Sequence, residues 1–95
     1  MNLFKTYKDA VGYQGRRTNL EKWHDFLTLI QEPHTKTSLN RRGNFQYNEL
    51  LEMILYSLKR NYIKYSIGNE YVIDQDGYET LQIVKDTLER IGREL

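Results

Sequence analysis

The apolar pattern changes its period once in the middle of the chain, between residues 44 and 73. The first part has helical spacing, and the residues on its expected buried stripe are Phe45, Leu50, Ile54, Leu55 and Leu58. Two short β-prone runs follow, IKYS and EYVI, separated by the turn residues Ile67, Gly68 and Asn69. A helix of about four turns that runs directly into a small hairpin is therefore expected.

Two further helices are predicted before this segment. Thr18 or Asn19 is a good N-cap, and Glu21 completes a capping box with Thr18. The apolar face of the helix that follows comprises Leu20, Trp23, Leu27 and Ile30, widened by Phe26. Pro33 ends this helix.

A second, short helix is expected from residue 35 to residue 43. Thr35 is its cap, Leu39 its core residue and Gly43 its C-terminal stop. Short helix, glycine-containing turn and longer helix together form a helix-turn-helix arrangement.

A last helix is predicted over residues 78–95, opened by a turn and cap at residues 74–77. Its apolar residues follow a heptad seam and are Leu81, Val84, Leu88, Ile91 and Leu95. The seam can cover the helical core of its own chain, and the first turn is expected to do so. A helix of roughly 27 Å exceeds the face of so small a domain, so the far half predicts a homodimer through this seam.

These elements predict an α+β fold: a winged helix-turn-helix, with a three-helix core, a two-stranded wing and a C-terminal dimerisation helix. The expected units are an N-terminal helix or arm (1–17), the winged helix-turn-helix domain (18–77) and the dimerisation helix (78–95).

Charge is unevenly distributed although the net charge is only +1. Residues 1–69 hold 11 Lys and Arg against 6 Asp and Glu, whereas residues 70–95 hold 3 against 7. The excess of basic residues in 1–69 and of acidic residues in 70–95 suggests that one face of the protein binds a polyanion and another face binds a different partner.

Several classes of function find no support in the sequence. The chain has no cysteine, and His24 and His34 do not share a helix, so metal-ligand spacing is absent. Asp74 and Asp76 fit a turn and helix cap better than a catalytic pair. We expect no enzymatic activity, no metal and no cofactor. No apolar run approaches the roughly 18 residues of a membrane span, and the N-terminus has no signal-peptide core. A soluble, intracellular and cytoplasmic protein is expected.

The run KTSLNRRGNFQYNELLEMILYSLKRNYIKYSIGNEYVIDQDGYETLQIV resembles the archaeal winged-helix family of small DNA-binding proteins. The likeness covers about residues 18–95. Its matching points are Lys36-Thr37, the entry Asn44 to Tyr47, Ile63, the Gly68-Asn69 wing and Gly77. The resemblance implies binding of double-stranded DNA, dimerisation by the last helix and no enzymatic activity. A chromatin-type member would be nucleoid-associated, and a transcriptional regulator is the other expectation.

A winged helix-turn-helix assigns roles to particular side chains. Gln46, Tyr47 and Asn48 occupy the place that meets base edges, although Tyr47 is equally compatible with a core position. The residues expected to contact phosphate or the minor groove around them are Lys36, Thr37, Arg41, Arg42, Asn44, Lys64, Ser66 and Asn69. Glu49 and Glu52 oppose a phosphate surface, so specificity is expected from amides and affinity from Arg41, Arg42 and the wing. The alternative is a winged-helix module that binds protein and not DNA.

Overall fold

The computed structural model describes residues 17–94 of the chain, so the predicted N-terminal arm, apart from Arg17, and Leu95 lie outside the described residues. Within that range the protein is a small α+β fold with four helices and one three-stranded antiparallel sheet. The elements in chain order are α2 (Asn19–Leu29), β1 (His34–Thr35), α3 (Lys36–Gly43), α4 (Tyr47–Lys59), β2 (Ile63–Tyr65), β3 (Glu70–Ile73) and α5 (Gln75–Glu94).

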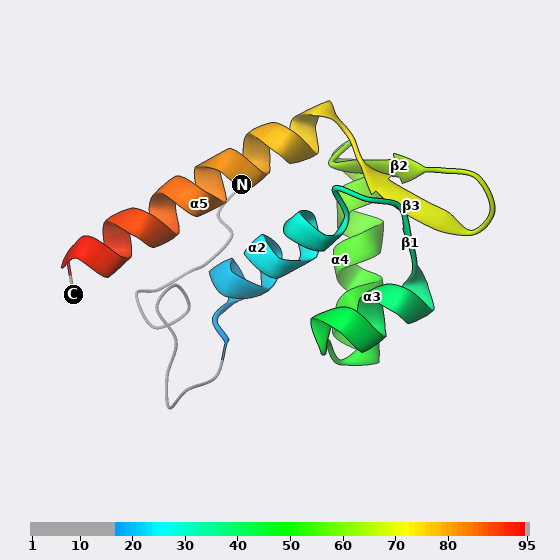
Figure 1. Ribbon diagram of the computed structural model, residues 1–95, viewed down its shortest axis with the longest axis horizontal. Coiled ribbons are helices and arrows are strands. Elements are labelled where there is room, and N and C mark those ends of the chain that lie inside the picture. The colour runs from blue at the N-terminus through cyan, green and yellow to red at the C-terminus, as the bar shows by residue number, and fades with distance from the viewer. Residues whose placement is uncertain (1–16, 95) are drawn as a thin grey trace.

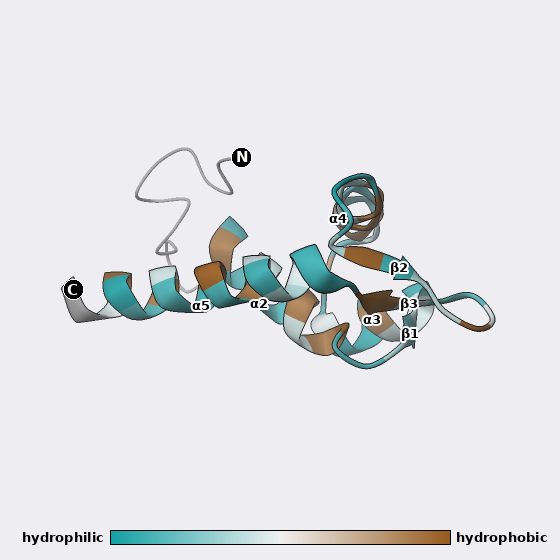
Figure 2. Cartoon of the chain, turned by 90° about the horizontal axis from the view of Figure 1, so that it is seen from above, coloured by the Kyte–Doolittle hydropathy of each residue, from teal (hydrophilic) through white to brown (hydrophobic). Residues whose placement is uncertain are grey.

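The helices and the sheet are arranged around α2 (Figure 1). α5 runs back along α2 in the opposite direction, and these two helices share the most extensive contact between elements. α3 and α4 lie beside the C-terminal end of α2, and the sheet projects from the same end. Seen from above, α4 stands out to one side of the layer that contains α5, α2 and the sheet (Figure 2).

The predicted capping box at the start of α2 is confirmed. The Thr18 hydroxyl accepts a hydrogen bond from the Glu21 amide at 3.1 Å, and the Glu21 carboxylate accepts one from the Thr18 amide at 3.2 Å. The predicted apolar face of this helix is buried throughout, from Leu20 to Ile30. α2 therefore supplies the largest part of the core, to which Trp23 and Phe26 contribute an edge-to-face aromatic pair.

The turn between α3 and α4 uses different residues from those expected. Thr35 caps α3 as predicted, and its hydroxyl accepts from the Ser38 amide at 3.1 Å. The left-handed residue that ends the helix is Asn44 (φ 53°), not Gly43. Gly43 is needed for space, because a Cβ there would collide with the Phe45 ring. Phe45 can thus close over the end of α3 and reach the core.

The stripe predicted on α4 is correct at Phe45, Leu50 and Ile54 and wrong at Leu55, whose exposed fraction is 67%. Leu58, also predicted, is half-buried and packs against the core. Met53 and Ser57 face the core in place of Leu55. The predicted stripe was too wide: successive residues on a helix are about 100° apart, so Leu55 falls beyond the edge of the buried face.

The sheet has a strand more than the two-stranded hairpin expected from the sequence. β1, only two residues long, pairs with β3 through His34↔Tyr71 and Thr35↔Glu70. The strand order is therefore β1-β3-β2, with β3 in the centre. The predicted hairpin of β2 and β3 is present, with Ile63 opposite Ile73 and Tyr65 opposite Tyr71. The Ile73 amide donates to the Ile30 carbonyl at 2.8 Å, which ties the sheet to the end of α2.

α5 begins three residues earlier than expected, at Gln75 instead of Tyr78. The Asp74 carboxylate accepts from the Gln75 amide at 2.8 Å, so Asp74 occupies the capping place. Gly77 is therefore a buried helical residue rather than part of a turn. A Cβ at Gly77 would collide with the Tyr62 carbonyl, so glycine lets α5 pass close to the segment between α4 and β2.

The predicted seam of α5 divides into two halves in one chain. Leu81 and Val84 are 2% and 0% exposed, whereas Leu88 and Ile91 are half-buried. The first half of the seam is thus core, as expected for its first turn. No helix among residues 17–94 is long and apolar enough to cross a membrane.

Candidate nucleic-acid interface

A hollow of about 620 Å³ lies where α3, α4 and the β2–β3 hairpin meet. Its lining residues are Thr35, Lys36, Thr37, Asn40, Tyr47, Tyr65, Asn69 and Tyr71. We call it the α3–hairpin hollow. Four of the residues predicted to bind DNA, namely Lys36, Thr37, Tyr47 and Asn69, are thereby brought to one place from three separate segments.

The first turn of α3 gives the α3–hairpin hollow its positive end. The first amides of a helix have no partner inside the helix, and the helix dipole adds a partial positive charge there. Lys36 is the first residue of α3 and adds a full charge, while Thr37 adds an exposed hydroxyl. Such an arrangement suits an anion such as a phosphate group.

Tyrosine rings make up much of the remaining surface. Tyr65 and Tyr71 are opposite each other on the hairpin, with ring centres 5.2 Å apart and planes inclined by 38°. Tyr65 is 67% exposed, and Tyr47 on α4 is 56% exposed. Exposed aromatic faces beside a positive helix end can stack against a sugar or a base.

Four lining residues were not predicted as site residues: Thr35, which was expected only as a helix cap, and Asn40, Tyr65 and Tyr71. Asn40 stands one helical turn after Lys36, a spacing that places both on one face of α3. Its amide nitrogen donates to the Phe45 carbonyl at 2.8 Å, which fixes the side chain. Alternation in β2 puts Tyr65 on the same face as Ile63, which packs toward the helices, but it does not tell which helix that face approaches.

The other predicted contacts lie outside the hollow's lining. Lys64 is opposite Val72 and alternates with Tyr65, so it is on the outer face of the hairpin. Arg42 borders a separate shallow pocket with Asp25 and Gly43, and Arg41 is exposed near the end of α3. The remaining predicted residues also do not line the hollow: Asn44, Gln46 and Asn48 are exposed and Ser66 is half-buried.

Arg17 is held within the fold by three contacts. Its guanidinium donates to the Asp25 carboxylate at 2.9 Å and to the Asn44 carbonyl at 2.6 Å. It also lies over the Phe45 ring, 4.9 Å from the ring centre. Arg17 therefore fixes the α3–α4 turn against the start of α2.

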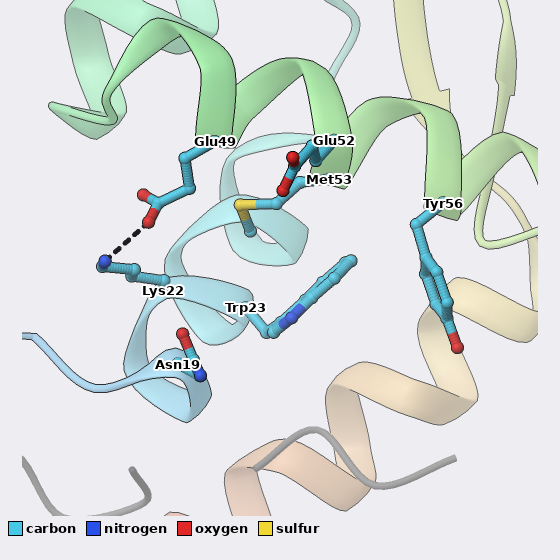
Figure 3. A pocket seen from close by; sticks show the side chains of 7 residues that line it. All are labelled: Asn19, Lys22, Trp23, Glu49, Glu52, Met53 and Tyr56. Atoms are coloured by element: carbon cyan, nitrogen blue, oxygen red, sulfur yellow. Dashed lines mark hydrogen bonds and ion pairs between the residues drawn. The ribbon is translucent and has the colours of Figure 1, made fainter.

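A second pocket, of about 320 Å³, lies between α2 and α4 on another side of α4 (Figure 3). Lys22 and Glu49 form an ion pair of 2.7 Å at one end, and the Tyr56 ring borders the other. Burial raises the pKa of the Tyr56 hydroxyl from its ordinary value, and the neighbouring Tyr62 raises it further. With Glu49 and Glu52 on its wall, this pocket is less suited to a phosphate than the α3–hairpin hollow.

The exposed residues of α4 are Tyr47, Asn48, Glu52, Leu55 and Lys59. Leu51 and Leu58 are half-buried and Leu55 is exposed, and they follow one another at helical spacing. Within α4 the acidic residues precede the single basic residue, Lys59.

Within residues 17–94 no group of three or more His, Asp or Glu side chains is placed to hold a metal ion. Comparison with protein-family models finds no match to this chain, and comparison with curated proteins finds no significant match.

Proposed function

We propose that this protein binds double-stranded DNA as a winged helix-turn-helix protein, with α3 and α4 as the helix-turn-helix and the β2–β3 hairpin as the wing. One observation carries the proposal. The start of α3, the start of α4 and the hairpin, three segments that the sequence pattern assigns to a DNA-binding face, line the same hollow. The likeness of the sequence to archaeal winged-helix proteins supports the same function.

In this proposal, phosphate contact and base contact come from different residues. A backbone phosphate binds at the first turn of α3, where Lys36 and Thr37 stand. Gln46 and Asn48 at the start of α4 offer amides to base edges in the major groove. Tyr65 and Asn69 of the wing contact the adjoining sugar-phosphate backbone.

Removing the charge at Lys36 tests the assignment. Lys36→Ala should weaken duplex binding and lower the salt dependence by about one unit of slope, because one phosphate contact is lost. Fluorescence anisotropy titrations of a labelled duplex at several salt concentrations measure both quantities. Arg42→Ala is the matched control, since it removes the same charge outside the hollow.

Two outcomes would contradict the assignment in different ways. An equal loss of affinity and slope in the two variants would mean that only net charge matters and that the hollow is not the site. Absence of any duplex binding by the unaltered protein at low salt would remove the proposed function altogether.

We also propose that the active form is a homodimer through the second half of α5. α5 has 20 residues and α2 has 11, so α5 is about 13 Å longer than the helix on which it packs. Leu88 and Ile91 remain half-buried in one chain and would be covered by the same helix of a second copy.

A protein-binding winged helix is the second candidate, and the outer side of α4 favours it. A helix that enters the major groove normally presents polar and basic side chains. Here Leu55 is 67% exposed, and Glu52 lies beside it. Failure to retard duplex DNA at low salt, together with a folded protein, would favour this candidate.

A further inference from the structure

An apolar stripe along α4 is only partly covered among the described residues: Leu58 packs in part against the core and Leu51 is half-buried, but Leu55 between them is exposed. We call Leu51, Leu55 and Leu58 the α4 stripe. They are spaced by four and three residues, which is the spacing of a coiled-coil seam. Leu55 at the centre is 67% exposed, although a leucine gains most when it is buried. Leu55 is not part of the core, because Leu50, Met53 and Ile54 already fill the side of α4 that faces it.

The charges that border the stripe have the symmetry of a self-complementary surface. Glu52 lies next to Leu51, and Lys59 lies next to Leu58, one heptad later on the same edge. Glu52 and Lys59 make no ion pair among the described residues, whereas the neighbouring Glu49 is already paired with Lys22. The stripe therefore carries an acidic end and a basic end that are not neutralised within one chain.

We infer that α4 pairs in antiparallel fashion with α4 of a second copy of this chain. A twofold axis near Leu55 places the Leu55 and Leu58 side chains of the two copies against one another. The same axis places Glu52 of each copy beside Lys59 of the other, so both ends of the stripe are neutralised at once. The two opposite-charge pairs lie on the same edge of the seam and are related by the twofold axis.

The position of α4 leaves room for such a pairing. α4 stands apart from the layer that contains α5, α2 and the sheet (Figure 2). The contact is small, so the association is expected to be weak and to depend on protein concentration. It is separate from the proposed α5 interface, because α5 packs along α2 and not along α4.

A consequence for DNA rests on the proposed function. The start of α4 would have to enter the groove, and the paired form covers the outer side of that helix. Self-association through the α4 stripe and duplex binding would therefore exclude one another. The second copy would block the access of DNA to α4 until the two copies dissociate.

The absence of native cysteine allows a direct test. In Leu55→Cys the twofold axis brings the two introduced thiols together, so mild oxidation should give a disulfide-linked dimer on a non-reducing gel. Ile83→Cys is the control, because Ile83 is similarly exposed, at 62%, and lies on α5 away from the stripe. We expect cross-linking at position 55 to be at least about tenfold faster than at position 83.

Charge exchange in the Leu55→Cys background tests the geometry. Glu52→Lys alone and Lys59→Glu alone should each slow cross-linking by about tenfold, since two attractive pairs become repulsive. The double change Glu52→Lys with Lys59→Glu should restore the original rate, because the two pairs are re-formed with their signs exchanged.

Two results would overturn the inference. One is cross-linking at position 55 no faster than at position 83, and the other is a double charge exchange that stays as slow as the single changes. These measurements contain no DNA, so they fail or succeed independently of the proposed function. Added duplex should slow the cross-linking only if both the inference and the proposed function hold.

Discussion

Two glycines show how much a single residue position is constrained by its neighbours. Gly77 and Gly92 both lie inside α5, where glycine is the weakest helix former after proline. A side chain at Gly77 would meet the Tyr62 carbonyl and the Ile73 side chain, whereas nothing lies within 4 Å of a Cβ built at Gly92. The first glycine is therefore required by packing and the second is not.

Alanine substitution should separate these two cases. Gly77→Ala should lower the free energy of unfolding by about 2 kcal/mol or more, because α5 must move away from the backbone of Tyr62. Gly92→Ala should raise it by up to about 1 kcal/mol, since alanine favours the helix and nothing obstructs it. Urea denaturation followed by circular dichroism measures both. A Gly77→Ala protein as stable as the original would mean that the close approach of α5 is not required.

At the scale of elements, sequence periodicity correctly predicted those features that depend on interactions between residues close together in the chain. The amphipathic face of α2, the cap of α3 and the β2–β3 hairpin all follow from side chains close together in the chain. β1 could not be predicted in this way. Two residues have no period, and His34 and Thr35 become a strand only because β3 is brought beside them.

The position of the α3–α4 turn was predicted correctly, but the roles of the residues that form it were not. Gly43 was taken as the helix stop because glycine commonly adopts a left-handed conformation there. The structure gives that conformation to Asn44, a residue type that tolerates it, and uses Gly43 to admit Phe45. The sequence contains both residues in succession, and local preference alone does not decide between them.

Substitutions at Asn44 should report on this turn. Asn44→Gly should keep or slightly raise the thermal stability, because glycine adopts a φ of 53° without strain. Asn44→Val should lower the free energy of unfolding by about 1–2 kcal/mol, since a β-branched residue is strongly disfavoured in that conformation. Tm values from calorimetry of the three proteins test the order. Equal Tm values for the glycine and valine variants would contradict a left-handed turn residue.

For the whole molecule, the candidate site could be predicted in part. Lys36, Thr37, Tyr47 and Asn69 were singled out from their places in the pattern, and they line one hollow. The tyrosines of the hairpin were missed as site residues because strand alternation fixes which residues share a face but not which helix that face approaches. Arg42 was grouped with the site by its distance along the chain, whereas α3 turns it toward the Asp25 side of the fold.

Shortening the chain tests the proposed pairing of α5. A chain ending at Arg90 should lose the homodimer, because it lacks Ile91 and the residues after it on the seam. Sedimentation velocity of the full and shortened chains, both carrying Glu52→Lys to suppress pairing through α4, should give a dimer and a monomer. The same mass for both chains would place the seam of α5 within a single copy.

The overhang of α5 predicts an uneven rate of amide hydrogen exchange along one helix. Backbone amides near Leu81 and Val84 are held by a packed face and should exchange only when the core opens. Those near Ile91 are held by helix hydrogen bonds with little packing and should exchange by fraying in dilute solution. As the protein concentration rises and a second copy covers the far end, that half should slow until the exchange profile is nearly level.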